Sequence, residues 1–216
     1  LNLQSSKKVE EHIIIKMRDA LAHRGPDDKG IYIANTIGLG HRRLSVLDTS
    51  LAGHQPFFSD DKRYVLVYNG EIYNFKEFYP ELIRNGFDIK TKSDTEVLLK
   101  LFQLHGTNML HRLNGMFAFA IWDNQEKKLT LVRDRMGVKP LYYSFYNESL
   151  YFASEQKALF TAGVPLKIAD DGLEEYIFNR FVAGKNTLYQ NIKKVLPGYV
   201  MTVQQDGKVI QEKWWD

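Results

Sequence analysis

The stretch that most constrains the fold is the run Gly115 to Asp123, GMFAFAIWD, near the middle of the chain. It is apolar on both faces, which is typical of a strand buried between two layers and not of a strand with one face in water. The polar segment 123–127 predicts a hairpin turn, and Leu129 to Asp134 predicts a strand that returns beside the first. The sequence therefore predicts an antiparallel sheet inside a layered fold.

The order of the other predicted helices and strands also favours a layered fold with antiparallel sheets. A helix is expected over 6–23, where Ser6 can cap it, and Ser93-Asp94-Thr95-Glu96 is typical of the start of another. Further helices are expected over about 74–85, 155–161 and 170–181, and further strands over 31–33, 37–47, 63–68, 140–143, 150–153 and within 198–214. Strands and helices do not alternate regularly, which disfavours a doubly wound or TIM-barrel fold and indicates an α+β fold. We expect one domain over 1–195, with the last strands and the start of a connection over 196–216.

Composition narrows the classes of function. The chain has 216 residues, of which 44% are hydrophobic and 25% charged, as in ordinary globular proteins. The net charge of +3 is spread along the chain, so nucleic-acid or membrane binding has little support. No apolar run approaches the roughly 20 residues of a membrane span, and we expect a cytoplasmic protein. The sequence contains no cysteine and no histidine pair with metal-ligand spacing, so we expect no disulfide, no metal site and no thiol nucleophile within it.

One short stretch, Tyr68 to Asn74, allows two interpretations. Asn69-Gly70 follows the strand-like run 64–68, and Asn-Gly is the strongest short turn signal, because both residues tolerate positive φ. Alternatively, a side-chain amide next to a glycine N–H can form an oxyanion hole, in which two donors stabilise a developing negative oxygen. The dipeptide alone favours the turn.

Three charged residues extend the second interpretation. Arg43 at the end of a strand is either a surface cation or a bidentate partner for a carboxylate. Asp94 is either a helix cap or a partner for an ammonium group, and Glu71 is either a surface charge or a second such partner. Together with Asn69-Gly70 they match the needs of an α-amino acid whose far end carries a carbonyl under attack. Spacing alone does not bring them together in space.

Eight strings of the chain, in order, carry a family resemblance. They are AHRGPDD (22–28), HRRLSVLD (41–48), VYNGEIYN (67–74), SDTEV (93–97), GMFAFAIWD (115–123), RDRMGVKPLYY (133–143), FASEQKAL (152–159) and LPGY (196–199). They resemble the N-terminal glutaminase domain of glutamine-hydrolysing asparagine synthetases, a class II amidotransferase domain. The resemblance implies an Ntn-hydrolase fold, a four-layer αββα sandwich with two antiparallel sheets.

The resemblance also implies roles for individual residues. Asn69 and Gly70 would form the oxyanion hole, and Arg43 would bind the glutamine α-carboxylate. Glu71 and Asp94 would hold the α-amino group. The backbone of Leu44, Ser45, Val46 and Leu47 would line the pocket. The segment 133–143 would support the core and the approach to a partner domain.

The chain departs from the family at its first residues. The family nucleophile is an N-terminal cysteine whose own α-amino group is the base. Residues 1–6 resemble the end of the first strand of the family, so we expect that strand to be lacking and the printed chain to be inactive. No cofactor is expected in this domain, whereas Mg-ATP is expected in an absent C-terminal synthetase domain that forms the amide of aspartate.

The expected partners are glutamine and that synthetase domain, and a homodimer is one alternative. Two other functions stay open at this stage. One is a non-catalytic module that binds glutamine or docks a partner. The other is an amidotransferase of the same type with a different acceptor.

Overall fold

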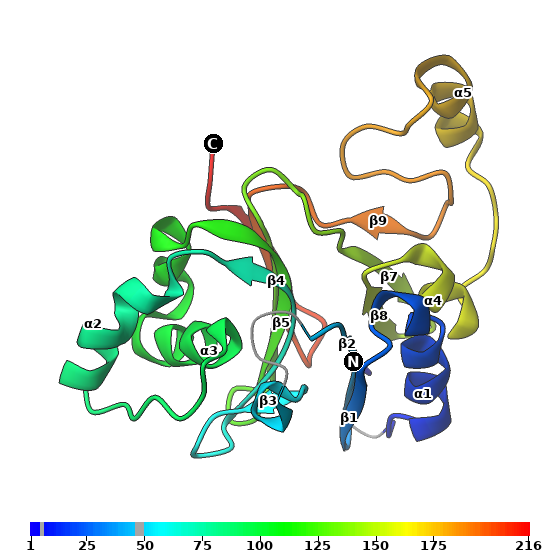
Figure 1. Ribbon diagram of the computed structural model, residues 1–216. Coiled ribbons are helices and arrows are strands. Elements are labelled where there is room, and N and C mark those ends of the chain that lie inside the picture. The colour runs from blue at the N-terminus through cyan, green and yellow to red at the C-terminus, as the bar shows by residue number, and fades with distance from the viewer. Residues whose placement is uncertain (5–6, 46–49) are drawn as a thin grey trace.

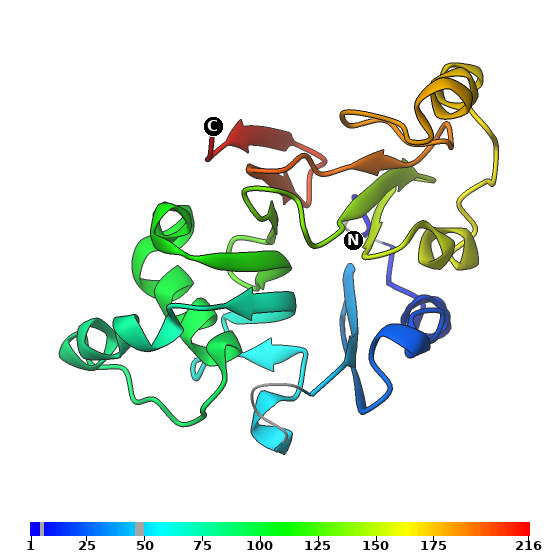
Figure 2. The same cartoon turned by 45° about the horizontal axis from the view of Figure 1, so that its top comes forward.

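The structure, a computed structural model, describes residues 1–4, 7–45 and 50–216. Its elements form four layers (Figure 1): helices α2 and α3, a six-stranded sheet, a second layer of strands, and helices α1 and α4. One apolar core lies between α2, α3 and the large sheet, and another lies between the two layers of strands. Figure 2 shows the same division from a second direction. The expected α+β sandwich of αββα type is confirmed.

The large sheet is antiparallel and has the strand order β11-β10-β6-β5-β4-β3. Its strands are β3 (Phe57–Phe58), β4 (Tyr64–Ile72), β5 (Gly115–Asp123), β6 (Lys128–Arg133), β10 (Tyr199–Gln204) and β11 (Val209–Lys213). Strand β5 is buried along both faces, since Phe117, Phe119 and Ile121 face the helices whereas Ala118 and Ala120 face the other strands. The predicted hairpin of β5 and β6 is thereby confirmed.

The second layer consists of two separate sheets instead of the single one expected. One pairs β1 (Asp28–Ala34) with β2 (Ile37–Arg43), and the other has the order β8 (Ser149–Ala153), β7 (Tyr142–Tyr146), β9 (Lys193–Lys194). Residues 1–3 lie between these sheets: the Asn2 N–H donates to the Thr36 carbonyl, and the Leu3 N–H to the Glu148 carbonyl. Within the described ranges no strand continues this bridge between β2 and β8, so the layer is divided.

The helices differ from the expected ranges mainly at their starts. They are α1 (Glu11–Asp19), α2 (Tyr79–Arg84), α3 (Asp94–His105), α4 (Gln156–Thr161) and α5 (Asp170–Asn179), with short 3-10 turns η1 (Ala22–Arg24), η2 (Leu51–Gly53), η3 (Phe75–Phe78) and η4 (Gly106–Arg112). The helix expected over 6–23 begins later, because the Val9 N–H donates to the Asn35 carbonyl and holds this stretch extended. The proposed cap Ser6 lies outside the described residues.

The strand expected over 37–47 is also shorter. Strand β2 ends at Arg43, which pairs with Asp28, the first residue of β1. Beyond Arg43 the ladder has no partner, and the Ser45 N–H donates to the Asp27 carboxylate instead. Among the described residues, no helix is long and apolar enough to cross a membrane.

Candidate functional site

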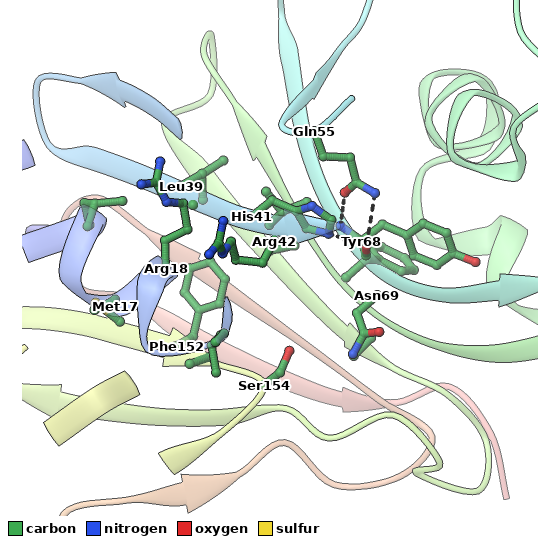
Figure 3. A pocket seen from close by; sticks show the side chains of 18 of the residues that line it. Met17, Arg18, Leu39, His41, Arg42, Gln55, Tyr68, Asn69, Phe152 and Ser154 are labelled. Atoms are coloured by element: carbon green, nitrogen blue, oxygen red, sulfur yellow. Dashed lines mark hydrogen bonds between the residues drawn. The ribbon is translucent and has the colours of Figure 1, made fainter. Parts of the chain in front are cut away.

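A cavity of about 660 Å³ is lined by residues of β2, β4, β5, β8 and helix α1. Gln55 and Asn69 lie at its polar end, and Met17, Leu39 and Phe152 line an apolar groove. Figure 3 shows the cavity from close by, with Asn69 and His41 reaching it from different strands. The polar end brings together residues that the sequence leaves 51 positions apart, namely Arg43, Leu44, Asn69, Gly70, Glu71 and Asp94. Ser45 is described but does not line the cavity, and Val46 and Leu47 lie outside the described residues.

Asn69 and Gly70 lie within strand β4, so the prediction of a turn at this dipeptide is wrong. Asn69 pairs with Ala118 and Gly70 with Phe117, and neither residue has positive φ. Pairing with β5 continues to Ile72, and this long-range contact overrides the local preference of Asn-Gly. The other interpretation, a pair of donors at the site, does not depend on a turn.

The geometry of β4 directs the Gly70 N–H away from β5. In an antiparallel ladder successive residues direct their backbone groups to opposite sides. The Arg63 carbonyl and the Tyr73 N–H bond toward β5, whereas Tyr68 and Ile72 direct their N–H groups to the other side. Gly70 has the same parity as Tyr68 and Ile72. Since β3 pairs with β4 only at Val65 and Leu66, the Gly70 N–H faces the cavity at an unpaired part of the strand edge.

Glycine is required at position 70 by a close approach of β5. A Cβ atom there would lie 2.3 Å from the Met116 carbonyl oxygen and 2.7 Å from the Phe117 Cα. No side chain can occupy that space without moving the neighbouring strand.

The Asn69 side chain is the second donor at this edge. Its Nδ2 atom is buried and has no hydrogen-bond partner among the described residues. Figure 3 shows the amide pointing from β4 across the cavity, on the side of Ser154. Buried amide donors are rarely left without partners in native proteins, because the unmade bond costs free energy. We therefore expect a ligand with a hydrogen-bond acceptor to bind next to the Asn69 amide.

Two residues that the sequence analysis missed hold the strand just before this pair. The Gln55 side chain accepts the Tyr68 N–H at 2.6 Å through Oε1 and donates to the Tyr68 carbonyl at 3.1 Å through Nε2 (Figure 3). His41 Nε2 lies 3.0 Å from the same carbonyl. Burial lowers the pKa of His41 to about 4, so the ring is neutral at neutral pH, and its Nε2 carries the proton that the carbonyl accepts. Gln55 thus replaces a neighbouring strand at Tyr68, which no local sequence pattern signals.

Asp94 is the first residue of α3 and is almost fully buried. The expected helix start is confirmed, with Ser93 as the cap, since its Oγ accepts the Thr95 N–H at 3.2 Å. The alternative of Asp94 as the cap is wrong. Asp94 Oδ2 accepts the Tyr68 hydroxyl at 2.7 Å and the Ile72 N–H at 2.9 Å. Burial raises the pKa of Asp94 above its ordinary value, and these hydrogen bonds oppose the shift. A carboxylate is therefore anchored beside Gly70 at the strand edge.

Arg43 supplies a positive charge to the same cavity from the end of β2. Its side chain is largely buried, and Nη1 donates to the Ser50 carbonyl at 2.7 Å. A Cβ atom on Gly53 would lie 2.1 Å from Arg43 Nη2, so the guanidinium needs glycine at that position. Glu71 is half-buried at the cavity wall. The described residues include no cluster of carboxylate, histidine or cysteine ligands that could hold a metal ion.

Comparison with known proteins gives matches over almost the whole chain. The model of a family described as "glutamine amidotransferase domain" matches residues 2–215. A glutamine-hydrolyzing asparagine synthetase 1 of Bacillus subtilis is 40% identical over 200 residues, which cover 93% of this chain and 32% of the relative. Asparagine synthetase B of Escherichia coli is 35% identical over 207 residues, covering 87% of this chain and 37% of the relative. The chain thus spans about a third of the length of these curated relatives.

A solved structure shares the fold. A glutamine phosphoribosylpyrophosphate amidotransferase from B. subtilis superposes with a TM-score of 0.73 at 21% sequence identity, over 97% of this chain and 48% of that chain. This likeness supports the Ntn-type sandwich that the resemblance implied.

Proposed function

The chain belongs to the glutamine amidotransferase domain family, and on that premise we propose that the polar end of the cavity binds glutamine and that the longer protein hydrolyses it to glutamate and ammonia. The observation that carries the proposal is the pair of open donors on β4, the Asn69 Nδ2 and the Gly70 N–H. A glutamine side-chain carbonyl fits that pair as an acceptor. When a nucleophile attacks the carbonyl carbon, the same two donors stabilise the negative oxygen that forms.

The charged residues of the cavity fit the other end of glutamine. Arg43 binds the α-carboxylate, since a guanidinium offers two parallel donors. Asp94 and Glu71 bind the α-ammonium group, and Leu44 completes the wall. Burial of Asp94 strengthens this contact, because a buried carboxylate gains more from a cation than an exposed one does.

The apolar groove of the cavity fits an extended segment that carries the nucleophile. Asn2 pairs antiparallel with Ser149, and Leu1 exchanges backbone hydrogen bonds with Leu150. In the same register, residues ahead of Leu1 would pair with Tyr151 onward and approach Ser154, across the cavity from Asn69. Such a strand would satisfy the edges of β2 and β8 and join the two small sheets into one.

A cysteine at the start of that strand completes the reaction. Its thiolate attacks the glutamine amide carbon to form a tetrahedral intermediate, and its α-amino group carries the thiol proton to the leaving nitrogen. The C–N bond then breaks, which releases ammonia and leaves a thioester. Water then hydrolyses the thioester to glutamate and restores the thiol. The ammonia would serve an ATP-dependent synthetase part of the longer protein, with Mg-ATP bound there and aspartate as acceptor. The names of the relatives support that acceptor.

An assay of ammonia release from glutamine by the full-length gene product tests the proposal. We expect release that is lost when the first-strand cysteine is replaced by alanine. Arg43→Ala should raise KM about 10²-fold, because a charge-assisted pair contributes a few kcal/mol. Arg43→Lys should recover only part of this loss, since lysine lacks the paired donors.

Two results would contradict the proposal. Glutamine binding by a full-length chain that carries the cysteine, without ammonia release, would favour a non-catalytic glutamine-binding module. An unchanged KM in Arg43→Ala would show that Arg43 does not bind the α-carboxylate of glutamine.

A further inference from the structure

Helix α5 and its flanks carry the most exposed apolar surface in the described part of the chain. Seven of the 18 exposed large hydrophobic side chains fall within 16 residues. This α5 surface consists of Leu166, Ile168, Leu173, Tyr176, Ile177, Phe178 and Phe181. Phe178 is 78% exposed, and Ile177 and Phe181 are each 61% exposed. Exposed large apolar side chains that are concentrated in one short segment indicate an interaction site.

The helix is attached to the rest of the domain by a narrow contact. Gly172 is its one buried residue, and a Cβ atom there would lie 2.7 Å from the Thr187 carbonyl oxygen. The Ala169 N–H donates to the Leu188 carbonyl at 2.9 Å, and Ile168 pairs with Tyr189. Figure 1 and Figure 2 show α5 projecting from the four layers. The domain thus positions α5 through one small face and leaves its large side chains uncovered.

We propose that the α5 surface docks against the polypeptide that follows Asp216 in the longer protein. This rests on the proposed function, in which a synthetase part follows the amidotransferase domain. The chain spans 32% and 37% of the lengths of two asparagine synthetase relatives, so those proteins contain enough additional chain to form a large partner surface.

The position of the C-terminus supports this occupant. In both views the C-terminus and α5 lie toward the same, upper side of the molecule. Exposed apolar side chains also gather near the end of the chain: Trp215 is exposed beneath the Arg135 guanidinium, 4.0 Å from its ring centre, and Met136 is exposed next to Arg135 in sequence. A domain that continues from Asp216 would therefore begin beside the exposed Trp215, on the upper side of the molecule from which α5 projects.

The charges of α5 disfavour a symmetric contact with a second copy. The helix contains Asp170, Asp171, Glu174 and Glu175 and no basic residue. A second copy of α5 would bring four more carboxylates to the contact and no basic residue of the helix to pair with them, which is unfavourable. The surface instead fits a partner that offers an apolar groove with basic residues at its rim.

Thiol labelling of the full-length gene product tests this docking without requiring enzyme activity. Cysteine is introduced singly as Phe178→Cys or Leu173→Cys, and Glu126→Cys in the exposed β5–β6 turn is the matched control. Maleimide labelling at each position is followed by mass spectrometry of the corresponding peptide. If the following domain covers α5, positions 173 and 178 should label at least about tenfold more slowly than position 126, since labelling then requires local opening.

The alternatives give different results. Equal labelling rates at 126, 173 and 178 would overturn the proposal, and so would protection that disappears on dilution, which would indicate a second copy. Failure of the proposed hydrolysis would leave these rates unchanged, so the two proposals can fail separately. Because two α5 positions are labelled, loss of docking caused by one substitution would appear as a disagreement between them.

Discussion

The edge of β4 and the helix α5 both lack a partner, but in opposite ways. At the β4 edge the buried Asn69 amide has no acceptor, although it lies among well-packed strands. On α5 the Phe178 ring has no apolar neighbour sufficient to cover it, although it lies at the surface. A buried polar group without a partner indicates a polar ligand, whereas exposed apolar surface indicates another protein surface. We therefore propose glutamine binding for the first region and assembly for the second.

Replacing Asn69 should have the largest effect. In the full-length protein, Asn69→Ala should lower kcat for glutamine hydrolysis on the order of 10²- to 10³-fold with little change in KM, because the lost donor acts mainly on the negative oxygen of the transition state. Steady-state kinetics measure this split. A rise in KM with unchanged kcat would instead place Asn69 in ground-state binding.

Replacing Gln55 should have the next largest effect. Gln55 does not touch the substrate but holds the backbone of Tyr68, two residues before Gly70. Gln55→Ala should lower kcat about tenfold through misplacement of the donors, less than loss of a donor itself, since His41 still bonds the Tyr68 carbonyl.

The nearly isosteric Gln55→Glu distinguishes hydrogen bonding from packing. Glutamate can accept the Tyr68 N–H, but when ionised it cannot donate to the Tyr68 carbonyl. Loss of kcat in both variants, with KM retained, is expected. Full activity in Gln55→Glu would mean that donation from Gln55 to the Tyr68 carbonyl is not needed to position the two donors.

Asp94→Asn should have different effects on glutamine binding and on the thermal stability of the protein. Burial raises the pKa of Asp94 above its ordinary value of 3.8, so folding favours the protonated form. The protonated carboxyl group therefore stabilises the folded protein fully below pH 3.8, and this contribution is lost as the pH rises through the raised pKa. At neutral pH the ionised carboxylate lowers the free energy of unfolding. Asp94→Asn should therefore keep or raise Tm at pH 7 while raising KM about tenfold, since a hydrogen-bonded charge is lost from the ammonium site. Thermal melts at several pH values measure the first effect, and a lower Tm of Asp94→Asn at pH 7 would contradict it.

A substitution on α5 should have the smallest effect on glutamine. Phe178→Ser should change KM for glutamine by less than about twofold, because an exposed side chain away from the cavity contributes little to it. A large change in KM would show that the two regions are not separate in function.

The sequence predicted most of the elements that local patterns determine. The buried strand β5, its hairpin with β6 and the start of α3 at Ser93 follow from apolar runs, turn residues and a cap. The site residues Arg43, Asn69, Gly70, Glu71 and Asp94 were selected from their side-chain chemistry and given roles by the family resemblance, and the structure places all of them in the lining of one cavity. Their individual roles remain proposals.

Other features depend on contacts that the sequence does not show. The prediction of a turn at Asn69-Gly70 was wrong because β4 stays paired with β5 as far as Ile72. The predicted start of the first helix was wrong because the Val9 N–H donates to the carbonyl of Asn35, in the turn between β1 and β2. The role of Gln55 was missed because a side chain that takes the place of a strand leaves no periodic signal.

The most direct test of the account is a crystal structure of the full-length protein, with the cysteine replaced by alanine, in complex with glutamine. The account predicts that the side-chain carbonyl oxygen lies about 3 Å from both Asn69 Nδ2 and the Gly70 nitrogen. The α-carboxylate should contact Arg43, and the ammonium group should contact Asp94. A bound glutamine whose carbonyl points away from β4, leaving Asn69 Nδ2 without an acceptor, would contradict it.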